Sequence, residues 1–162
     1  SPGVRTVGKV FLMRVEAPSM RYLVATDGSE QADDAVRYAA THATAMDATL
    51  DIVHVLAPRA ELVDGELVFP GGEKAIEIGD RTLDGAVGIA EDVADEHGGG
   101  IEIETQLLSG RPADAIADYA QETGADGIYV GHRGLSEKQE QVTGSVAKSV
   151  VDRATVPVTV IR

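Results

Sequence analysis

The chain has 162 residues, 43% of them hydrophobic, enough to bury the core of one domain, and it contains no cysteine, which excludes disulfides and cysteine metal sites. Its 27 acidic residues against 14 lysines and arginines give a net charge of -13, and such a surface repels nucleic acid. No apolar stretch approaches the roughly 18 residues of a membrane span and no signal peptide is evident, so we expect a cytoplasmic protein that binds neither membranes nor nucleic acids.

The acidic surplus has two explanations. Carboxylates in place of lysines, among many small residues, are typical of proteins that stay soluble in concentrated salt, where charge repulsion is screened within a few ångströms. We therefore expect a halophilic source, and the alternative is an ordinary acidic cytosolic protein.

Residues 1–19 differ in character from the rest of the chain. Their apolar run, "KVFLMRV", is too short for the core of a signal peptide. We interpret the segment as an N-terminal extension, either added artificially or the product of a misassigned start, with Met20 as the expected beginning. Residues 20–162 are then a single domain.

The first elements are predicted to be a strand, a helix and a second strand. "RYLVATD" is an apolar run that ends at Asp27, and Ser29 is a natural N-cap for a helix whose alanines recur at three- and four-residue steps. "TLDIVHVL" predicts the next strand. Residues 57–72 interrupt the pattern with prolines and glycines, which predicts a loop of unusual length, mobile or functional.

A helix over 73–97 and a strand over 101–108 are predicted next. Three glycines stop the helix, and "IEIETQLL" alternates cleanly, which indicates a strand with one exposed face near a sheet edge. We expect His54 to be a satisfied residue near the core, and His42 and His97 to lie on helix surfaces.

The last third of the chain predicts a helix, an interior strand, a helix and a final strand. "SGRPADAIADYAQETG" has Pro112 in its first turn and Gly124 at its end, the asymmetry expected of a helix. "DGIYV" is continuously apolar, as expected of a strand buried on both faces. "SVAKSVVDRA" predicts a helix that starts at Ser145, and "VPVTVIR" closes the chain as a strand.

The alternation of strands and helices predicts an α/β fold, with an open parallel sheet and helices on both faces. In such sheets ligands bind beyond the carboxyl ends of the strands, where the strand order reverses. Asp27 and Gly131 both lie at predicted carboxyl ends, so the loop "VGHRGLSEKQEQVTGSV" borders the expected ligand crevice.

The glycines of this loop indicate an anion site. Gly131 ends a strand, Gly134 permits a tight turn, and Gly144 and Ser145 open the final helix, where free amides and the helix dipole favour a phosphate. Arg133 adds positive charge, as do His132 and Lys138. The spacing is neither a Walker P-loop nor the GxGxxG dinucleotide motif, so hydride transfer is disfavoured.

The spacing Gly131-x2-Gly134-x9-Gly144-Ser145 resembles the ATP-binding signature of the universal stress protein family. "YLVATDGSEQADDAVRYAA" resembles that family's first strand, aspartate and helix, "IVHVL" its second strand, and "VPVTVIR" its last. The likeness extends over residues 21–162.

The resemblance implies a Rossmann-like, five-stranded parallel sheet of order 3-2-1-4-5 and a homodimer that pairs through the C-terminal strand. It also implies ATP as ligand, held without dedicated catalytic residues. The nucleotide-binding positions that it assigns are Asp27, Val55, Val130, Gly131, Gly134, Gly144, Ser145 and Val146. Arg133 falls at a position that the family fills variably, and its role is our own inference.

Alternatives remain open at this stage. Asp27 and Ser145 are also common residue types at the ends of helices. Glu137 and Glu140 would oppose a phosphate unless they point outward or hold a divalent cation such as magnesium.

We expect an ATP-binding regulator of the stress response, and the alternatives are a dimeric interaction module without nucleotide, or an enzyme such as a slow ATP hydrolase. No catalytic residue and no resident metal site are predicted, since four scattered histidines without cysteine favour no zinc site.

Overall fold

The computed structural model describes residues 20–56, 59–132 and 140–162, which form an α/β domain around one five-stranded parallel sheet. Its strands are β2 (Arg21–Ala25), β3 (Thr49–Val55), β6 (Ile103–Leu108), β7 (Gly127–Gly131) and β8 (Val158–Ile161). They lie in the order β6-β3-β2-β7-β8, and every neighbouring pair is parallel. Counted along the chain, this is the predicted order 3-2-1-4-5.

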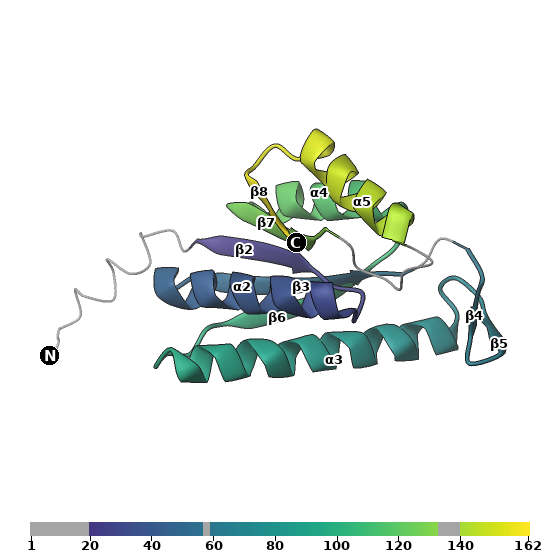
Figure 1. Ribbon diagram of the computed structural model, residues 1–162, viewed down its shortest axis with the longest axis horizontal. Coiled ribbons are helices and arrows are strands. Elements are labelled where there is room, and N and C mark those ends of the chain that lie inside the picture. The colour runs from purple at the N-terminus through teal and green to yellow at the C-terminus, as the bar shows by residue number, and fades with distance from the viewer. Residues whose placement is uncertain (1–19, 57–58, 133–139) are drawn as a thin grey trace, which may run out of the picture.

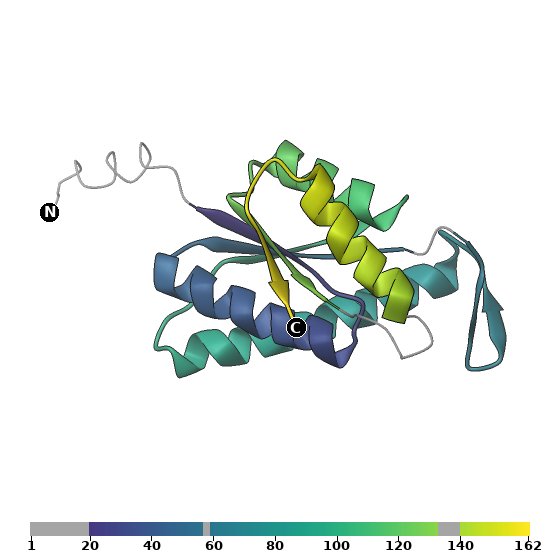
Figure 2. The same cartoon turned by 45° about the horizontal axis from the view of Figure 1, so that its top comes forward.

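Two helices cover each face of the sheet, as predicted. Helices α2 (Glu30–Met46) and α3 (Glu73–Glu96) lie on one face, and α4 (Pro112–Thr123) and α5 (Glu140–Arg153) lie on the other (Figures 1 and 2). Each face buries its own aliphatic core, one against α2 and α3 and one against α4 and α5. Strand β7 is buried on both faces and β6 lies at an edge, which confirms both expectations.

The caps that the sequence predicts are present. The Ser29 hydroxyl accepts a hydrogen bond from the Ala32 amide at 3.2 Å and caps α2. Pro112 begins α4, and Gly124 ends it in the left-handed conformation with φ 70°.

A hairpin replaces part of the predicted loop over 57–72. Strands β4 (Glu61–Val63) and β5 (Glu66–Val68) pair antiparallel and project beyond the carboxyl end of the sheet (Figure 1). Asp64 and Gly65 link them with φ values of 51° and 80°, as a tight two-residue turn requires. The Asp-Gly pair between apolar residues is the signal that predicts such a hairpin, and the loop prediction overlooked it.

An aromatic cluster joins α2 to the sheet and corrects the expectation for His42. This histidine is half-buried, and the Tyr129 hydroxyl lies 2.6 Å from its Nδ1. The rings of Tyr22 and Tyr38 pack against Tyr129 at centroid distances of 5.7 and 6.2 Å. Burial raises the pKa of Tyr129 to about 12, so its hydroxyl stays protonated within this contact. His97 is exposed, as expected.

A buried ion pair lies at the amino end of the sheet. Arg21 Nη1 on β2 donates to both carboxylate oxygens of Asp51 on β3 at 2.7 Å, and Arg21 Nη2 lies 3.4 Å from Glu104 on β6. Asp51 is 1% exposed, and this burial raises its pKa above the ordinary value although the Arg21 guanidinium opposes the shift.

Candidate functional site

The strand order reverses between β2 and β7. The chain leaves β2 through α2 to reach β3 on one side, whereas β7 lies on the other side. Asp27 follows the carboxyl end of β2, and Gly131 is the last residue of β7. The structure therefore brings these two predicted site residues to the position where open α/β sheets bind ligands.

The turn that carries Asp27 is held by a set of short hydrogen bonds. The Gly28 amide donates to Thr26 Oγ1, and the Ser29 amide donates to Asp27 Oδ1, both at 3.0 Å. Gly28 has φ 83°, which a residue with a side chain adopts only with strain. Asp27 is thus fixed at the edge of the sheet with one oxygen engaged in the turn.

This geometry bears on the two interpretations of Asp27. Its Oδ1 organises the start of α2, as the structural alternative proposed. Its Oδ2 accepts no hydrogen bond from any residue in the described ranges, so a ligand hydroxyl or amine can be bound without disturbing the turn. The two roles are compatible, and the ligand contact stays a prediction.

His54 connects the turn to the neighbouring strand. Its Nδ1–H donates to the carbonyl oxygen of Thr26 at 2.8 Å, since a carbonyl oxygen can only accept. Half-buried and bonded, His54 is the satisfied histidine that the sequence predicted. Its support of the residue next to Asp27 could not be predicted from local sequence, because the two strands are joined only by the fold.

Three predicted site residues share one apolar cluster. Val55 at the end of β3, Val130 on β7 and Val146 on α5 all belong to the core that packs against α4 and α5, so they lie on the same face of the sheet. Val55 and Val146 are half-buried, whereas Val130 is only 4% exposed. An apolar ligand group at this edge can contact the side chain of Val55, but it meets little of the Val130 side chain.

Gly131 has a structural explanation that the sequence did not reveal. A Cβ at this position would lie 3.2 Å from the carbonyl oxygen and 3.3 Å from the carbonyl carbon of Gln31, in the first turn of α2. The end of β7 therefore approaches the α2 backbone so closely that a side chain would displace one of them. This packing accounts for the glycine with or without a ligand.

The start of the final helix was predicted wrongly. Helix α5 begins at Glu140, not at Ser145, and Gly144 and Ser145 lie within it, about one turn from its start. Glutamate and glutamine are good helix formers, and the run from Glu140 to the glycine holds no proline to stop the helix. The backbone amides without internal partners accordingly belong to the turn that starts at Glu140. Arg133, Gly134, Glu137 and Lys138 lie outside the described residues.

The described part of the chain offers binding groups at this edge: a fixed carboxylate, an apolar wall and a helix N-terminus. Over the same ranges, no three histidine or carboxylate side chains gather as a metal site. None of the helices described is both long and apolar enough to cross a membrane.

Sequence comparison relates the chain to a known family. Residues 19–162 match the family described as the Universal stress protein family. Universal stress protein YxiE of Bacillus subtilis is 32% identical over 146 residues, which cover 88% of this chain and 98% of that protein. Universal stress protein MJ0531 of Methanocaldococcus jannaschii is 30% identical over 147 residues, which cover 88% and 81%.

Solved structures show the same fold. A universal stress protein from Archaeoglobus fulgidus in complex with dAMP is 29% identical, with a TM-score of 0.66, covering 88% of this chain and 98% of that one. A universal stress protein in complex with cAMP is 27% identical, with a TM-score of 0.61, covering 90% and 98%.

Proposed function

The chain belongs to the universal stress protein family, and from this premise we propose that it binds an adenine nucleotide, with ATP as the expected ligand. The observation that carries the proposal is the position of Asp27 and Gly131 on either side of the reversal in strand order. The complexes of two similar proteins with dAMP and cAMP support the ligand class, because both ligands combine adenine with a phosphate.

The proposed pose follows from the chemistry of each end of the crevice. Val55 supplies an apolar surface for the base, and Oδ2 of Asp27 accepts a hydrogen bond from the nucleoside. The phosphates lie toward the first turn of α5, where unpaired amides and the helix dipole favour negative charge. Arg133, Gly134, Gly144 and Ser145 complete the phosphate side as the family resemblance implies. Magnesium accompanies the nucleotide and is not held by the protein alone.

A regulatory role fits a site built for binding. We propose that nucleotide occupancy changes the conformation of the loops around the crevice and so selects protein partners in a cytoplasmic stress response. A homodimer through β8 is part of this proposal. That strand lies at a sheet edge, and its residues are half-buried. An uncovered edge strand invites aggregation, and pairing with a second copy would cover it.

Isothermal titration calorimetry of ATP, AMP, cAMP and dAMP, with and without magnesium, tests the proposal. Asp27→Asn keeps Oδ1 as the acceptor for the Ser29 amide, so the turn persists and only the negative charge is lost. We expect nucleotide affinity to fall at least about tenfold, the effect of a lost charged hydrogen bond. Asp34→Asn, which makes the same charge change on exposed α2 surface, is the control and should bind as wild type does.

Two results would overturn the assignment. One is the absence of heat with every nucleotide, in low salt and in molar KCl, for folded wild-type protein. The other is an Asp27→Asn variant that binds as tightly as wild type.

Gly144→Val tests the phosphate end separately. Valine is no worse than glycine in a helix, so we expect the chain to fold and nucleotide binding to be lost.

A further inference from the structure

The β4–β5 hairpin carries large apolar side chains on its outer side. Leu62 and Leu67 are direct cross-strand partners, so they lie on one face of the hairpin, and Phe69 follows directly after the end of β5. These three residues are 74%, 52% and 61% exposed. Val63 and Val68 point the other way, and Val68 is buried. The hairpin is thus attached by its inner face while its apolar outer face meets solvent.

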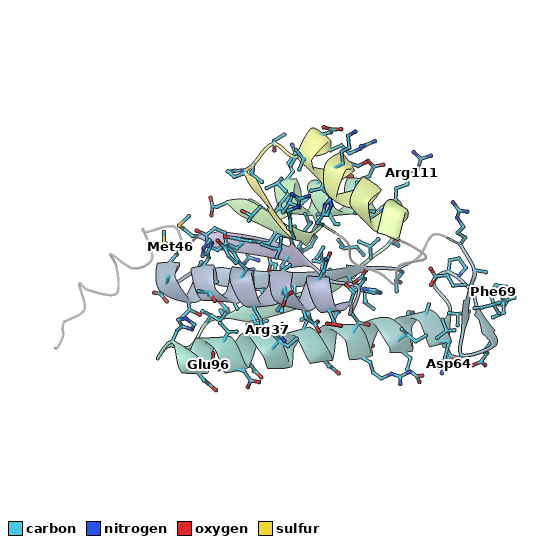
Figure 3. All side chains as sticks on the ribbon, viewed as in Figure 1. Arg37, Met46, Asp64, Phe69, Glu96 and Arg111 are labelled. Atoms are coloured by element: carbon cyan, nitrogen blue, oxygen red, sulfur yellow. The ribbon has the colours of Figure 1, made fainter. Side chains whose placement is uncertain are left out.

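The exposed face is large for a lone surface feature. At about 200 Å² for each fully exposed large apolar residue, the three side chains present on the order of 400 Å². Contiguous apolar patches of this size on monomers commonly mark interaction sites. Figure 3 shows Phe69 and Asp64 at the end of the molecule that the hairpin forms, away from Met46 at the opposite end.

A small pocket lies on the other side of the hairpin. It has a volume of about 60 Å³ and lies between the inner side of the hairpin, the start of α3 and the end of β3, with Val63, Val68, Phe69, Ile78 and His54 in its wall. A cavity that holds benzene measures about 150 Å³, so this pocket admits the end of one aliphatic side chain. It is lined by residues of the inner side, opposite to Leu62 and Leu67, so it is not part of the outer face.

Charge distinguishes between the possible occupants. Glu61, Asp64 and Glu66 are exposed. Glu61 and Glu66 share the inner side with Val63 and Val68, and Asp64 lies in the turn, so these carboxylates flank the apolar face. Arg59 precedes β4, and Lys74 follows β5 at the start of α3. These carboxylates lie within about a Debye length of the patch, so they attract a basic partner. They would repel the same acidic hairpin on a second copy of a chain whose net charge is -13.

The available area leads to the same conclusion. A stable dimer buries about 800 Å² on each partner, twice the area that the hairpin face presents. A patch of this size is instead large enough to cover the apolar side of a short amphipathic segment. We propose that the outer face of the β4–β5 hairpin docks a basic amphipathic segment of a partner protein. The inner side of the same hairpin borders the proposed nucleotide site, because His54 lines the pocket there and binds the carbonyl oxygen next to Asp27.

Fluorescence anisotropy with a labelled leucine–lysine peptide, patterned so that its leucines form one helix face, tests the proposal on the full chain. The triple variant Leu62→Ser, Leu67→Ser, Phe69→Ser should bind this peptide at least about tenfold more weakly than wild type. Since all three side chains are exposed, the variant should melt within a few degrees of wild type. Met46→Ser removes a residue that is 51% exposed at the far end and should bind as wild type does.

A shuffled peptide of the same composition separates docking from attraction to a generally acidic surface, and it should bind wild type and triple variant equally weakly. Hydrogen exchange should slow in residues 61–69 when the patterned peptide binds. The proposal is overturned if the triple variant retains wild-type affinity, or if wild type does not bind the patterned peptide. Concentration-dependent association of wild type in sedimentation, lost in the triple variant, would instead identify a second copy as the occupant and overturn the assigned partner.

Discussion

Helix α3 contains three glycines whose replacement by alanine should have opposite effects on stability. Gly79 faces the sheet, and a Cβ there would lie 2.7 Å from Leu107 Cδ2, 3.2 Å from His54 Cδ2 and 3.3 Å from Leu56 Cδ2. Gly85 and Gly88 lie in the same helix with nothing within 4 Å of an added Cβ. The three sites therefore share helical backbone and differ in the space available.

The expected magnitudes follow from two competing terms. Alanine is favoured over glycine in a helix interior by about 1 kcal/mol, so Gly85→Ala and Gly88→Ala should each stabilise the protein by close to that amount. At Gly79 the same gain meets an overpacking cost of about 1–3 kcal/mol. The Leu107 methyl group can move, but the His54 ring is held by its hydrogen bond to Thr26, so we expect a cost near 2 kcal/mol and net destabilisation.

Urea denaturation followed by circular dichroism measures these differences, and Gly85→Ala should exceed Gly79→Ala by about 2 kcal/mol in the free energy of unfolding. In a chain of this size the gap corresponds to roughly 4–8 °C in melting temperature. Equal stabilisation by Gly79→Ala and Gly85→Ala would refute the claim that α3 needs a glycine to approach β3 and β6.

Three further predictions concern charge. Arg21→Met leaves Asp51 buried without its cation and should cost about 3 kcal/mol in the free energy of unfolding. Burial raises the pKa of Asp51 in the folded state, so the stability that Asp51 contributes is lost as pH rises through that pKa and returns as pH falls toward the ordinary aspartate value. Wild type should therefore gain stability relative to Asp51→Asn when the pH is lowered from 7 to 4. A constant difference between the two proteins in urea titrations would contradict this. The net charge of -13 predicts that molar KCl relieves self-repulsion of about 2 kcal/mol and raises the melting temperature by roughly 4–8 °C, and a calorimetric profile that is flat in salt would remove the halophilic expectation.

The element types and most of their ends were predictable because their signals lie within a few residues. The Ser29 cap, Pro112 at the start of α4 and the left-handed Gly124 at its end act on their own helices, and the structure confirms each. The strand order came from the family resemblance and not from periodicity. The Asp64-Gly65 turn was equally local, and its hairpin was missed because the surrounding prolines and glycines were interpreted as a loop.

The candidate site was predictable only in part. The position of Asp27 follows from a strand end and the rules of parallel sheets. The start of α5 was misplaced because Gly144 was interpreted as a helix start, although the glutamate and glutamine at 140 and 141 are themselves good helix formers. The contact of Gly131 with the α2 backbone was beyond sequence reasoning, since it depends on how far strand and helix approach each other.

What the amino-acid sequence determined by itself is the alternation of strands and helices, their caps and the acidic character of the surface. Only the tertiary structure decided that Asp51 is buried while Glu104, on the neighbouring strand, is exposed, and that His42 meets Tyr129 and not solvent. It also decided that Leu62, Leu67 and Phe69 remain uncovered by the described residues. The physical reason is that hydrogen bonds within a helix or turn are set by adjacent residues, whereas burial depends on which surfaces the chain brings together from distant positions.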